Sequence, residues 1–178
     1  MASEFSSLFS TSFGIGVVHA SERGILGVHL PDLGKIAAGF EKSACEYESS
    51  GLTEYASELL CRYFAGERIE FDDVPVDLSG FPPFRFKALH AIRGISYGEI
   101  RSYGAIAAMC GSPYAARAVG GAMASNPVPV IIPCHRIVAG NGRLTGFSAP
   151  GGETAKMMLL RMEGVEFKGL LATQKKLL

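Results

Sequence analysis

The sequence lacks an apolar run long enough to cross a membrane, because no uninterrupted apolar stretch reaches the roughly 18 residues that a spanning helix needs. It also lacks the basic start and apolar core of an export signal, since it begins Met1-Ala2-Ser3-Glu4. We therefore expect no membrane association and a cytoplasmic, nucleoid-associated location, where thiols stay reduced.

Cysteine is scarce and forms no C-x-x-C pair, the four being Cys45, Cys61, Cys110 and Cys134. The histidines before residue 100 are equally scattered, at His19, His29 and His90. This spacing argues against zinc, and we expect no metal site. Three cysteines have no motif around them and are predicted to be packed small hydrophobes: Cys45, Cys61 and Cys110.

The chain has no net charge, with 17 Lys and Arg against 17 Asp and Glu, but its charges are unevenly placed. Residues 1–84 hold five basic against thirteen acidic residues, whereas residues 85–143 hold seven basic residues and a single acidic one. A basic half joined to an acidic half is typical of a protein that contacts nucleic acid with one of its parts.

Hydrophobic patterning divides the chain in two. Four elements are predicted in the first part: strands over 13–20, 24–30 and 69–76, and a helix over 52–64. Gly80-Phe81-Pro82-Pro83 then interrupts any regular element, and the composition changes from acidic to basic at the same point. We therefore place a domain border near residue 80.

Four helices are predicted after this border, over 84–92, 103–110, 114–124 and 154–162. The middle two are separated by Gly111-Ser112-Pro113, and two short helices with a Gly-containing turn form a helix-turn-helix signature. Ser112 is expected to cap the later helix, with Pro113 in its first turn. Asn141-Gly142 suits a tight hairpin turn.

The helix predicted over 114–124 is unusually rich in small residues. Gly120 and Gly121 each cost about 1 kcal/mol relative to alanine inside a helix, so they call for a reason. Small side chains permit close approach to another surface, which is either a second helix or a nucleic-acid groove. Arg117 projects from the same helix with few candidate partners nearby in sequence, and both interpretations stay open on these residues alone.

The most informative stretch is Ile132-Pro133-Cys134-His135-Arg136-Ile137-Val138. An apolar setting raises the pKa of a thiol and makes it inert, whereas a neighbouring imidazole and cation lower it. Pro133 fixes its own φ and favours an extended Ile132, which helps to aim the cysteine that follows. Cys134 and His135 are therefore either packed core residues or a nucleophile with its base.

This stretch and four others resemble the O6-alkylguanine-DNA alkyltransferases, or methylated-DNA–protein-cysteine methyltransferases. The other four are Arg117-Ala118-Val119-Gly120-Gly121-Ala122-Met123, Asn126-Pro127-Val128-Pro129, Gly146-Phe147-Ser148 and Leu159-Leu160-Arg161-Met162-Glu163-Gly164. The resemblance implies three regions: a ribonuclease-H-like α/β domain over 1–80, a mainly α winged helix-turn-helix domain over 81–168, and a tail over 169–178.

The resemblance also implies direct-reversal DNA repair, in which a single alkyl group moves irreversibly from O6 of guanine, and from O4 of thymine, to Cys134. His135 would take the thiol proton through a water, and Glu163 would orient the imidazole. Tyr103 would donate its hydroxyl to the leaving base. The alkyl donor is the DNA itself, so no cofactor is implied.

Five further residues are assigned to DNA and base binding by the same resemblance. Arg117, on a helix in the minor groove, would replace the flipped guanine in the base stack. Ser148 would bond near the substituted oxygen, the Ile137 carbonyl would accept from the exocyclic amine, and Asn126 would brace the turn before the cysteine. Phe147, where several relatives have tyrosine, would wall the alkyl group. The expected partner is double-stranded DNA bearing O6-alkylguanine, bound by a monomer without sequence preference.

Three other classes of protein share parts of this pattern. Lesion-binding alkyltransferase-like proteins keep the arginine helix but replace the cysteine, and Cys134 argues against that class. A regulator that senses alkylation would need a second DNA-binding domain. A Cys-His hydrolase would need an oxyanion-hole loop, and none is evident in the sequence.

Overall fold

The computed structural model describes residues 4–31 and 48–173, so the prediction for Cys45 and residues 174–178 of the predicted tail lie outside the described residues. The first part contains β1 (Glu4–Thr11), β2 (Gly14–Ser21), β3 (Gly24–His29) and α1 (Gly51–Phe64). The second part contains α2 (Pro83–Arg93), β4 (Arg101–Ser102), α3 (Tyr103–Met109), α4 (Ala116–Ala124), the 3₁₀ helix η2 (Cys134–Arg136), β5 (Ile137–Val138), α5 (Gly152–Met162), β6 (Glu166–Lys168) and β7 (Leu171–Thr173).

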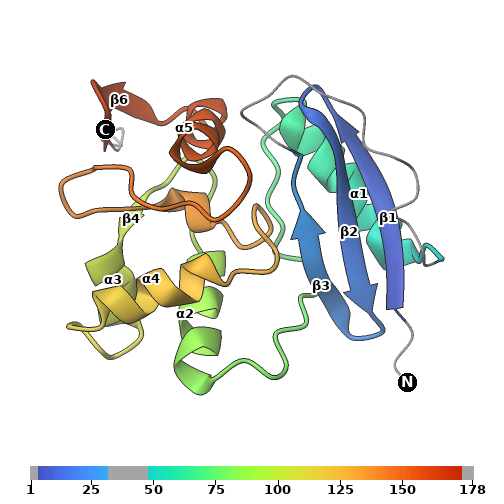
Figure 1. Cartoon of the computed structure of the whole chain (residues 1–178), viewed down its shortest axis with the longest axis horizontal. Coiled ribbons are helices and arrows are strands. Elements are labelled where there is room, and N and C mark those ends of the chain that lie inside the picture. The colour runs from blue at the N-terminus through green and yellow to red at the C-terminus, as the bar shows by residue number, and fades with distance from the viewer. Residues whose placement is uncertain (1–3, 32–47, 174–178) are drawn as a thin grey trace.

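The N-terminal strands form an antiparallel sheet in the order β1-β2-β3, with α1 packed across one face (Figure 1). The predicted hairpin is confirmed as β2 and β3, and the predicted helix as α1. Ser50 caps α1 in a reciprocal capping box with Thr53, which fixes where the helix begins. β1 was not predicted, because its serines interrupt the alternation of apolar residues.

The strand predicted over 69–76 is wrong. Asp72 and Asp73 form a turn, and only Val76 makes an isolated bridge, to Ile25 of β3. Pro75 has no N–H to donate, although its carbonyl accepts from the Ile25 N–H at 2.8 Å. A Cβ on Gly24 would lie 2.9 Å from that carbonyl oxygen, so glycine is what allows this segment to lie against β3.

The helices predicted in the second part are confirmed as α2, α3, α4 and α5, with one error at the start of α4. Ser112 and Pro113 do not cap it: the Ala115 N–H donates to the Ser112 carbonyl, so these residues close a turn of their own. The helix begins at Ala116 without a side-chain cap. The predicted boundary at 168/169 falls inside the β6-β7 hairpin, a pairing that was not predicted.

One hydrophobic core runs through both parts of the chain, from Phe9 and Leu60 to Ile92 and Leu159. Polar contacts tie the same halves together, since the Val28 N–H of β3 donates to the Pro127 carbonyl at 2.8 Å. Across the described ranges, no helix is both long and apolar enough to cross a membrane. The two parts therefore share their packing, although the sequence suggests a border near residue 80.

Leu60→Ala removes a fully buried side chain from α1 and is expected to lower the free energy of unfolding by about 2–5 kcal/mol. Leu170→Ala is the control: its side chain is 72% exposed, so its effect is expected to stay within about 0.5 kcal/mol.

Because the core is continuous, both parts of the chain are expected to unfold in one urea transition, followed by circular dichroism and by labelling of Cys134. Two separate transitions would contradict the shared core.

Candidate active site

Cys134 is the first residue of η2 and is almost fully buried. Its N–H donates to the Ile132 carbonyl at 2.8 Å, which closes a tight turn centred on Pro133. The following strand β5 pairs in parallel with β4, with Arg101 opposite Ile137. Since β4 leads directly into α3, this pairing brings the N-terminus of α3 and its Tyr103 beside the cysteine.

The loop before the cysteine is held by Asn126. Its side-chain amide donates to the Ile132 carbonyl at 2.9 Å, and its side-chain oxygen accepts from the Val128 N–H at 3.1 Å. Inside the loop, buried Val130 has φ 74°, a conformation that costs a β-branched residue of the order of 1–3 kcal/mol. The Asn126 hydrogen bonds therefore hold a strained backbone that leads into Cys134.

A cavity of about 410 Å³ opens onto the thiol. Its lining is mostly apolar and combines residues from α3, α4, η2 and the loop before α5: Tyr103, Gly120, Met123, Ala124, Cys134, Thr145, Gly146, Phe147 and Ser148. Four of the residues singled out from the sequence, Tyr103, Cys134, Phe147 and Ser148, thus meet in one cavity. Ile137 is buried directly beyond η2 and is not among the lining residues.

The thiol of Cys134 is subject to opposing influences. Burial raises its pKa, whereas a hydrogen bond from Asn126 and the positive charge of Lys156 act to lower it. Lys156 is itself fully buried on α5, and burial lowers the pKa of its ammonium group to about 8. Lys156 was missed by the sequence analysis, since a lysine on a helix is ordinarily exposed.

Lys156 also fixes one wall of the cavity. Its ammonium donates to the Thr145 carbonyl at 2.9 Å and to the Gly146 carbonyl at 3.4 Å. The Tyr103 hydroxyl donates to the same Thr145 carbonyl at 3.0 Å. Tyr103 and the loop that carries Phe147 are therefore joined through one backbone oxygen.

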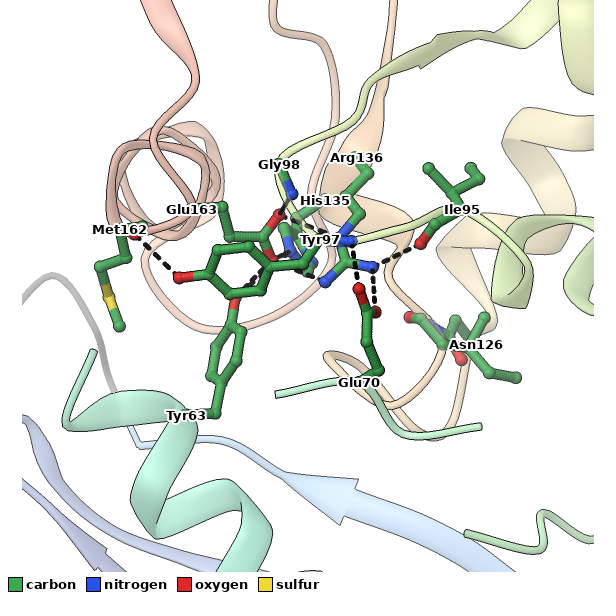
Figure 2. Close-up of polar contacts among 11 residues, drawn as sticks. Tyr63, Glu70, Ile95, Tyr97, Gly98, Asn126, His135, Arg136, Met162 and Glu163 are labelled. Atoms are coloured by element: carbon green, nitrogen blue, oxygen red, sulfur yellow. Dashed lines mark hydrogen bonds and ion pairs between the residues drawn. The ribbon is translucent and has the colours of Figure 1, made fainter. Parts of the chain in front are cut away.

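His135 is not among the residues that line the cavity, and its ring faces Glu163, the C-cap residue of α5 (Figure 2). The His135 Nε2 and Glu163 Oε1 atoms are 2.7 Å apart, and both side chains are fully buried. Although burial opposes ionisation, His135 and Arg136 hold the pKa of the Glu163 carboxyl far below its usual range. Burial likewise lowers the pKa of His135, which favours the neutral ring.

The carboxylate of Glu163 collects hydrogen bonds from three other residues. Arg136 grips it with two donors, Nε to Oε2 and Nη2 to Oε1, each at 2.9 Å. The Gly98 N–H donates to Oε2 at 3.1 Å, and the Tyr63 hydroxyl of α1 donates to Oε1 at 2.7 Å. A Cβ on Gly98 would lie 2.8 Å from the Glu163 carbonyl oxygen, so only glycine fits there.

This arrangement fixes which nitrogen of His135 carries its proton. An ionised carboxylate only accepts hydrogen bonds, so Nε2 must be the protonated nitrogen that faces Glu163. Nδ1 is then the unprotonated nitrogen, and it is buried with no hydrogen-bond partner among the residues that the structure describes. The neutral ring therefore presents a basic lone pair that no protein group occupies.

Arg117 lies on the exposed face of α4, while Gly120 of the same helix lines the cavity. One short helix thus presents a cation to solvent and a smooth surface to the thiol pocket. Arg136 and Tyr63 were missed as site residues, because an arginine after Cys-His and a tyrosine 100 residues before Glu163 give no sequence signal of their contact with that carboxylate. Within the described residues, no group of three His, Cys, Asp or Glu side chains is placed to hold a metal.

The site combines a buried cysteine, a mostly apolar cavity and a buried histidine–glutamate pair. Residues 83–165 match the family described as "6-O-methylguanine DNA methyltransferase, DNA binding domain". The chain is also 44% identical to the constitutive methylated-DNA–protein-cysteine methyltransferase of Bacillus subtilis over 121 residues, which cover 68% of this chain and 71% of that protein.

Two mycobacterial proteins give similar matches. The methylated-DNA–protein-cysteine methyltransferase of Mycolicibacterium paratuberculosis is 47% identical over 108 residues, which cover 61% of this chain and 63% of the relative. A crystal structure of Mycobacterium tuberculosis OGT in complex with DNA aligns with a TM-score of 0.73 and 34% identity, over 90% of this chain and 93% of that one. The chain therefore belongs to the methylated-DNA–protein-cysteine methyltransferase family, whose mixed α/β fold it shares.

Acidification is expected to destabilise the fold through two buried groups. The pKa of His135 is lowered from 6.5 and that of Glu163 from 4.5, so the unfolded chain binds more protons in both cases and stability falls as the pH falls. The loss begins below about pH 6.5 and grows steeper below about pH 4.5. The loss of stability is measured as the fall in the urea midpoint of unfolding between neutral pH and about pH 4.

Glu163→Gln is expected to be less stable than the unmodified protein at neutral pH, because the buried Arg136 loses its nearest counter-charge and keeps only Glu70, at 3.9 Å. The fall of its urea midpoint with pH should also be less steep below about pH 4.5. Glu153→Gln, an exposed change on the same helix, is the matched control and should follow the unmodified protein. If the urea midpoint of Glu163→Gln fell with pH as steeply as that of the unmodified protein, the Glu163 carboxyl would not be held ionised by its neighbours.

Proposed function

We propose that this protein repairs DNA by moving an alkyl group from O6 of guanine, and from O4 of thymine, to its own Cys134 in a single irreversible step. The observation that carries the proposal is the juxtaposition of the Cys134 thiol, an apolar cavity of about 410 Å³ and the buried His135–Glu163 pair. The B. subtilis and M. paratuberculosis relatives are named for such a transfer.

The first step is removal of the thiol proton. Thiolate is the nucleophilic form of cysteine, and the unoccupied lone pair on His135 Nδ1 would take the proton through a bridging water. Glu163 would then stabilise the imidazolium at Nε2. Lys156, which acts to lower the pKa of the Cys134 thiol, would favour the thiolate at the opposite side of the sulfur.

Transfer would follow as an in-line displacement. A bond forms between Sγ of Cys134 and the alkyl carbon while the bond from that carbon to O6 breaks, and the electron pair passes to the base. The base regains one ring N–H, so the proton lost by the thiol is balanced by the proton gained by guanine. No oxidant, reductant or cofactor is needed, and the protein is spent after one turnover.

Tyr103 and Ser148 would stabilise the departing base. The Tyr103 hydroxyl donates to the Thr145 carbonyl in this structure and would turn to the base ring when guanine enters. The Thr145 carbonyl would keep its hydrogen bond from Lys156, so no buried acceptor is left alone. Phe147 would wall the alkyl group, Ser148 would bond near O6, and the carbonyls of Cys134 and Ile137 would accept from the exocyclic amine.

A guanine inside a duplex cannot reach a thiol that is buried beneath α4, so the base must be flipped out. Arg117 is exposed on α4, the helix whose Gly120 lines the cavity. Its side chain would fill the gap that the flipped base leaves in the base stack. Contact through α4 in the minor groove would depend on shape and backbone, and hence would be largely independent of sequence. The structure of M. tuberculosis OGT, a relative, is a complex with DNA.

The finer fold assignments are part of the same proposal. The β1-β2-β3 sheet with α1 supports a ribonuclease-H-like domain over 1–80, and the α3–turn–α4 pair supports a winged helix-turn-helix domain over 81–168. We propose that Asn126 serves as a structural brace and not as a reacting group. We also propose that the protein acts as a monomer on double-stranded DNA, in the cytoplasm at the nucleoid, where its damaged-DNA substrate would be found.

The proposal is tested by intact-protein mass spectrometry after incubation with duplex DNA that contains O6-methylguanine. A gain of one methyl group, about 14 Da, confined by peptide mapping to Cys134 and stopping at one per chain, is expected for a single-use thiolate nucleophile. Cys134→Ala should gain nothing while it still binds the DNA. Tight binding without any mass gain would instead make the protein a lesion-binding member of the family.

Arg117→Ala is expected to slow transfer from duplex DNA by about tenfold or more, because flipping costs a few kcal/mol that the arginine helps to offset. Transfer from free O6-benzylguanine should change little, since no base is flipped. Arg161→Ala, which removes an exposed arginine from α5, is the matched control. Equal losses on both substrates would remove the flipping role from Arg117.

A further inference from the structure

The N-terminal part of the chain reaches into the reaction centre through one side chain. Tyr63, in the last turn of α1, is 1% exposed and donates its hydroxyl to Glu163 Oε1 at 2.7 Å. The same hydroxyl oxygen lies 3.4 Å from Nε2 of His135 (Figure 2). Tyr63 therefore touches both members of the pair that stands behind the Cys134 thiol.

We propose that Tyr63 is a positioning residue for the alkyl transfer, so that the N-terminal part completes the catalytic network by closing the His135–Glu163 hydrogen bond to water. The inference rests on the proposed function, because the reaction that it tunes is that of the Cys134 thiol. Tyr63 itself contacts neither the base nor the sulfur.

The packing of Tyr63 leaves its hydroxyl a single orientation. Its ring lies against Phe64, Phe71 and Tyr97, with ring centroids 5.3, 6.0 and 6.1 Å away. Burial and the neighbouring Glu163 carboxylate raise the pKa of the Tyr63 phenol well above its ordinary value, so it stays protonated and acts as a donor. A ring fixed in this way holds its O–H on Oε1 before the reaction begins, so no rotational freedom is lost when the thiol reacts.

Three protein donors surround the Oε1 atom of Glu163. Arg136 Nη2, His135 Nε2 and the Tyr63 hydroxyl all approach this one atom, at 2.9, 2.7 and 2.7 Å. Without the hydroxyl, a water can enter and compete with the imidazole for the carboxylate. The His135 ring would then be less firmly held in the tautomer and orientation that leave Nδ1 unprotonated.

Tyr97 provides a matched control in the same cluster. It is a tyrosine whose ring contacts that of Tyr63, but its hydroxyl donates to the Met162 carbonyl at 3.0 Å and not to Glu163. Tyr63→Phe and Tyr97→Phe therefore remove the same atom from neighbouring rings. Only the first change removes a donor from the carboxylate.

The test is the pH dependence of Cys134 alkylation by iodoacetamide in the full chain, followed by peptide mapping. In Tyr63→Phe the rate at neutral pH is expected to fall about three- to tenfold, with the midpoint of the profile raised by up to about one pH unit. Tyr97→Phe should follow the unmodified protein. A Tyr63→Phe profile that superimposes on that of the unmodified protein, or an equal shift in Tyr97→Phe, would overturn the proposal.

Because iodoacetamide requires no guanine recognition, this test can be read even if the unmodified protein fails to accept a methyl group from DNA. Unfolding midpoints of both variants separate a packing defect, which lowers the midpoint without moving the pH profile, from the positioning role. Should Tyr63→Phe not fold, the Tyr63 hydroxyl proton of the unmodified protein is expected to exchange slowly in NMR and to lie close to the His135 ring. A rapidly exchanging hydroxyl would overturn the proposal.

Discussion

The buried carboxylate of Glu163 is the interaction on which the rest of the site depends. A charge removed from water is strongly destabilising unless hydrogen bonds and counter-charges replace the lost hydration. Here the replacement comes from three sequence regions: α1, the turn at Gly98, and the η2 segment of His135 and Arg136. The requirement to satisfy one carboxylate thus brings together elements that are as much as 100 residues apart.

The surroundings of the Cys134 thiol depend on a second set of buried residues. Burial raises the pKa of the Cys134 thiol and by itself makes it unreactive, whereas a hydrogen bond from Asn126, the charge of Lys156 and a backbone hydrogen bond from His135 act to lower that pKa. Lys156 carries its charge into the core without a carboxylate partner at hydrogen-bond distance among the described residues, and it uses its donors on the Thr145 and Gly146 carbonyls. The cavity wall and the electrostatics of the thiol therefore depend on the same lysine.

Local sequence signals predicted the fold to different extents. The helices and the β2-β3 hairpin follow from hydrophobic periodicity. The family motifs pointed to four of the residues that line the cavity, namely Tyr103, Cys134, Phe147 and Ser148. The predicted strand over 69–76 failed, because Asp72, Asp73 and Pro75 outweigh its apolar residues. The β6-β7 hairpin escaped notice because its strands are only three residues each.

The site was only partly predictable for a different physical reason. Cys134, His135 and Glu163 belong to motifs that can be read along the chain, whereas Tyr63 and Lys156 acquire their roles only through tertiary packing. A buried lysine and a helical tyrosine look, in sequence, like an exposed cation and a core aromatic. Their contacts with Thr145 and Glu163 have no local signature, so only the three-dimensional arrangement reveals them.

The most direct test of this account is the protonation state of the His135 ring, measured by ¹⁵N NMR of the imidazole nitrogens at neutral pH. We expect a neutral ring protonated at Nε2, with Nδ1 unprotonated and able to take the proton of the Cys134 thiol. A ring protonated at Nδ1 would mean that Glu163 does not set the tautomer, and would contradict the assignment of His135 as the base.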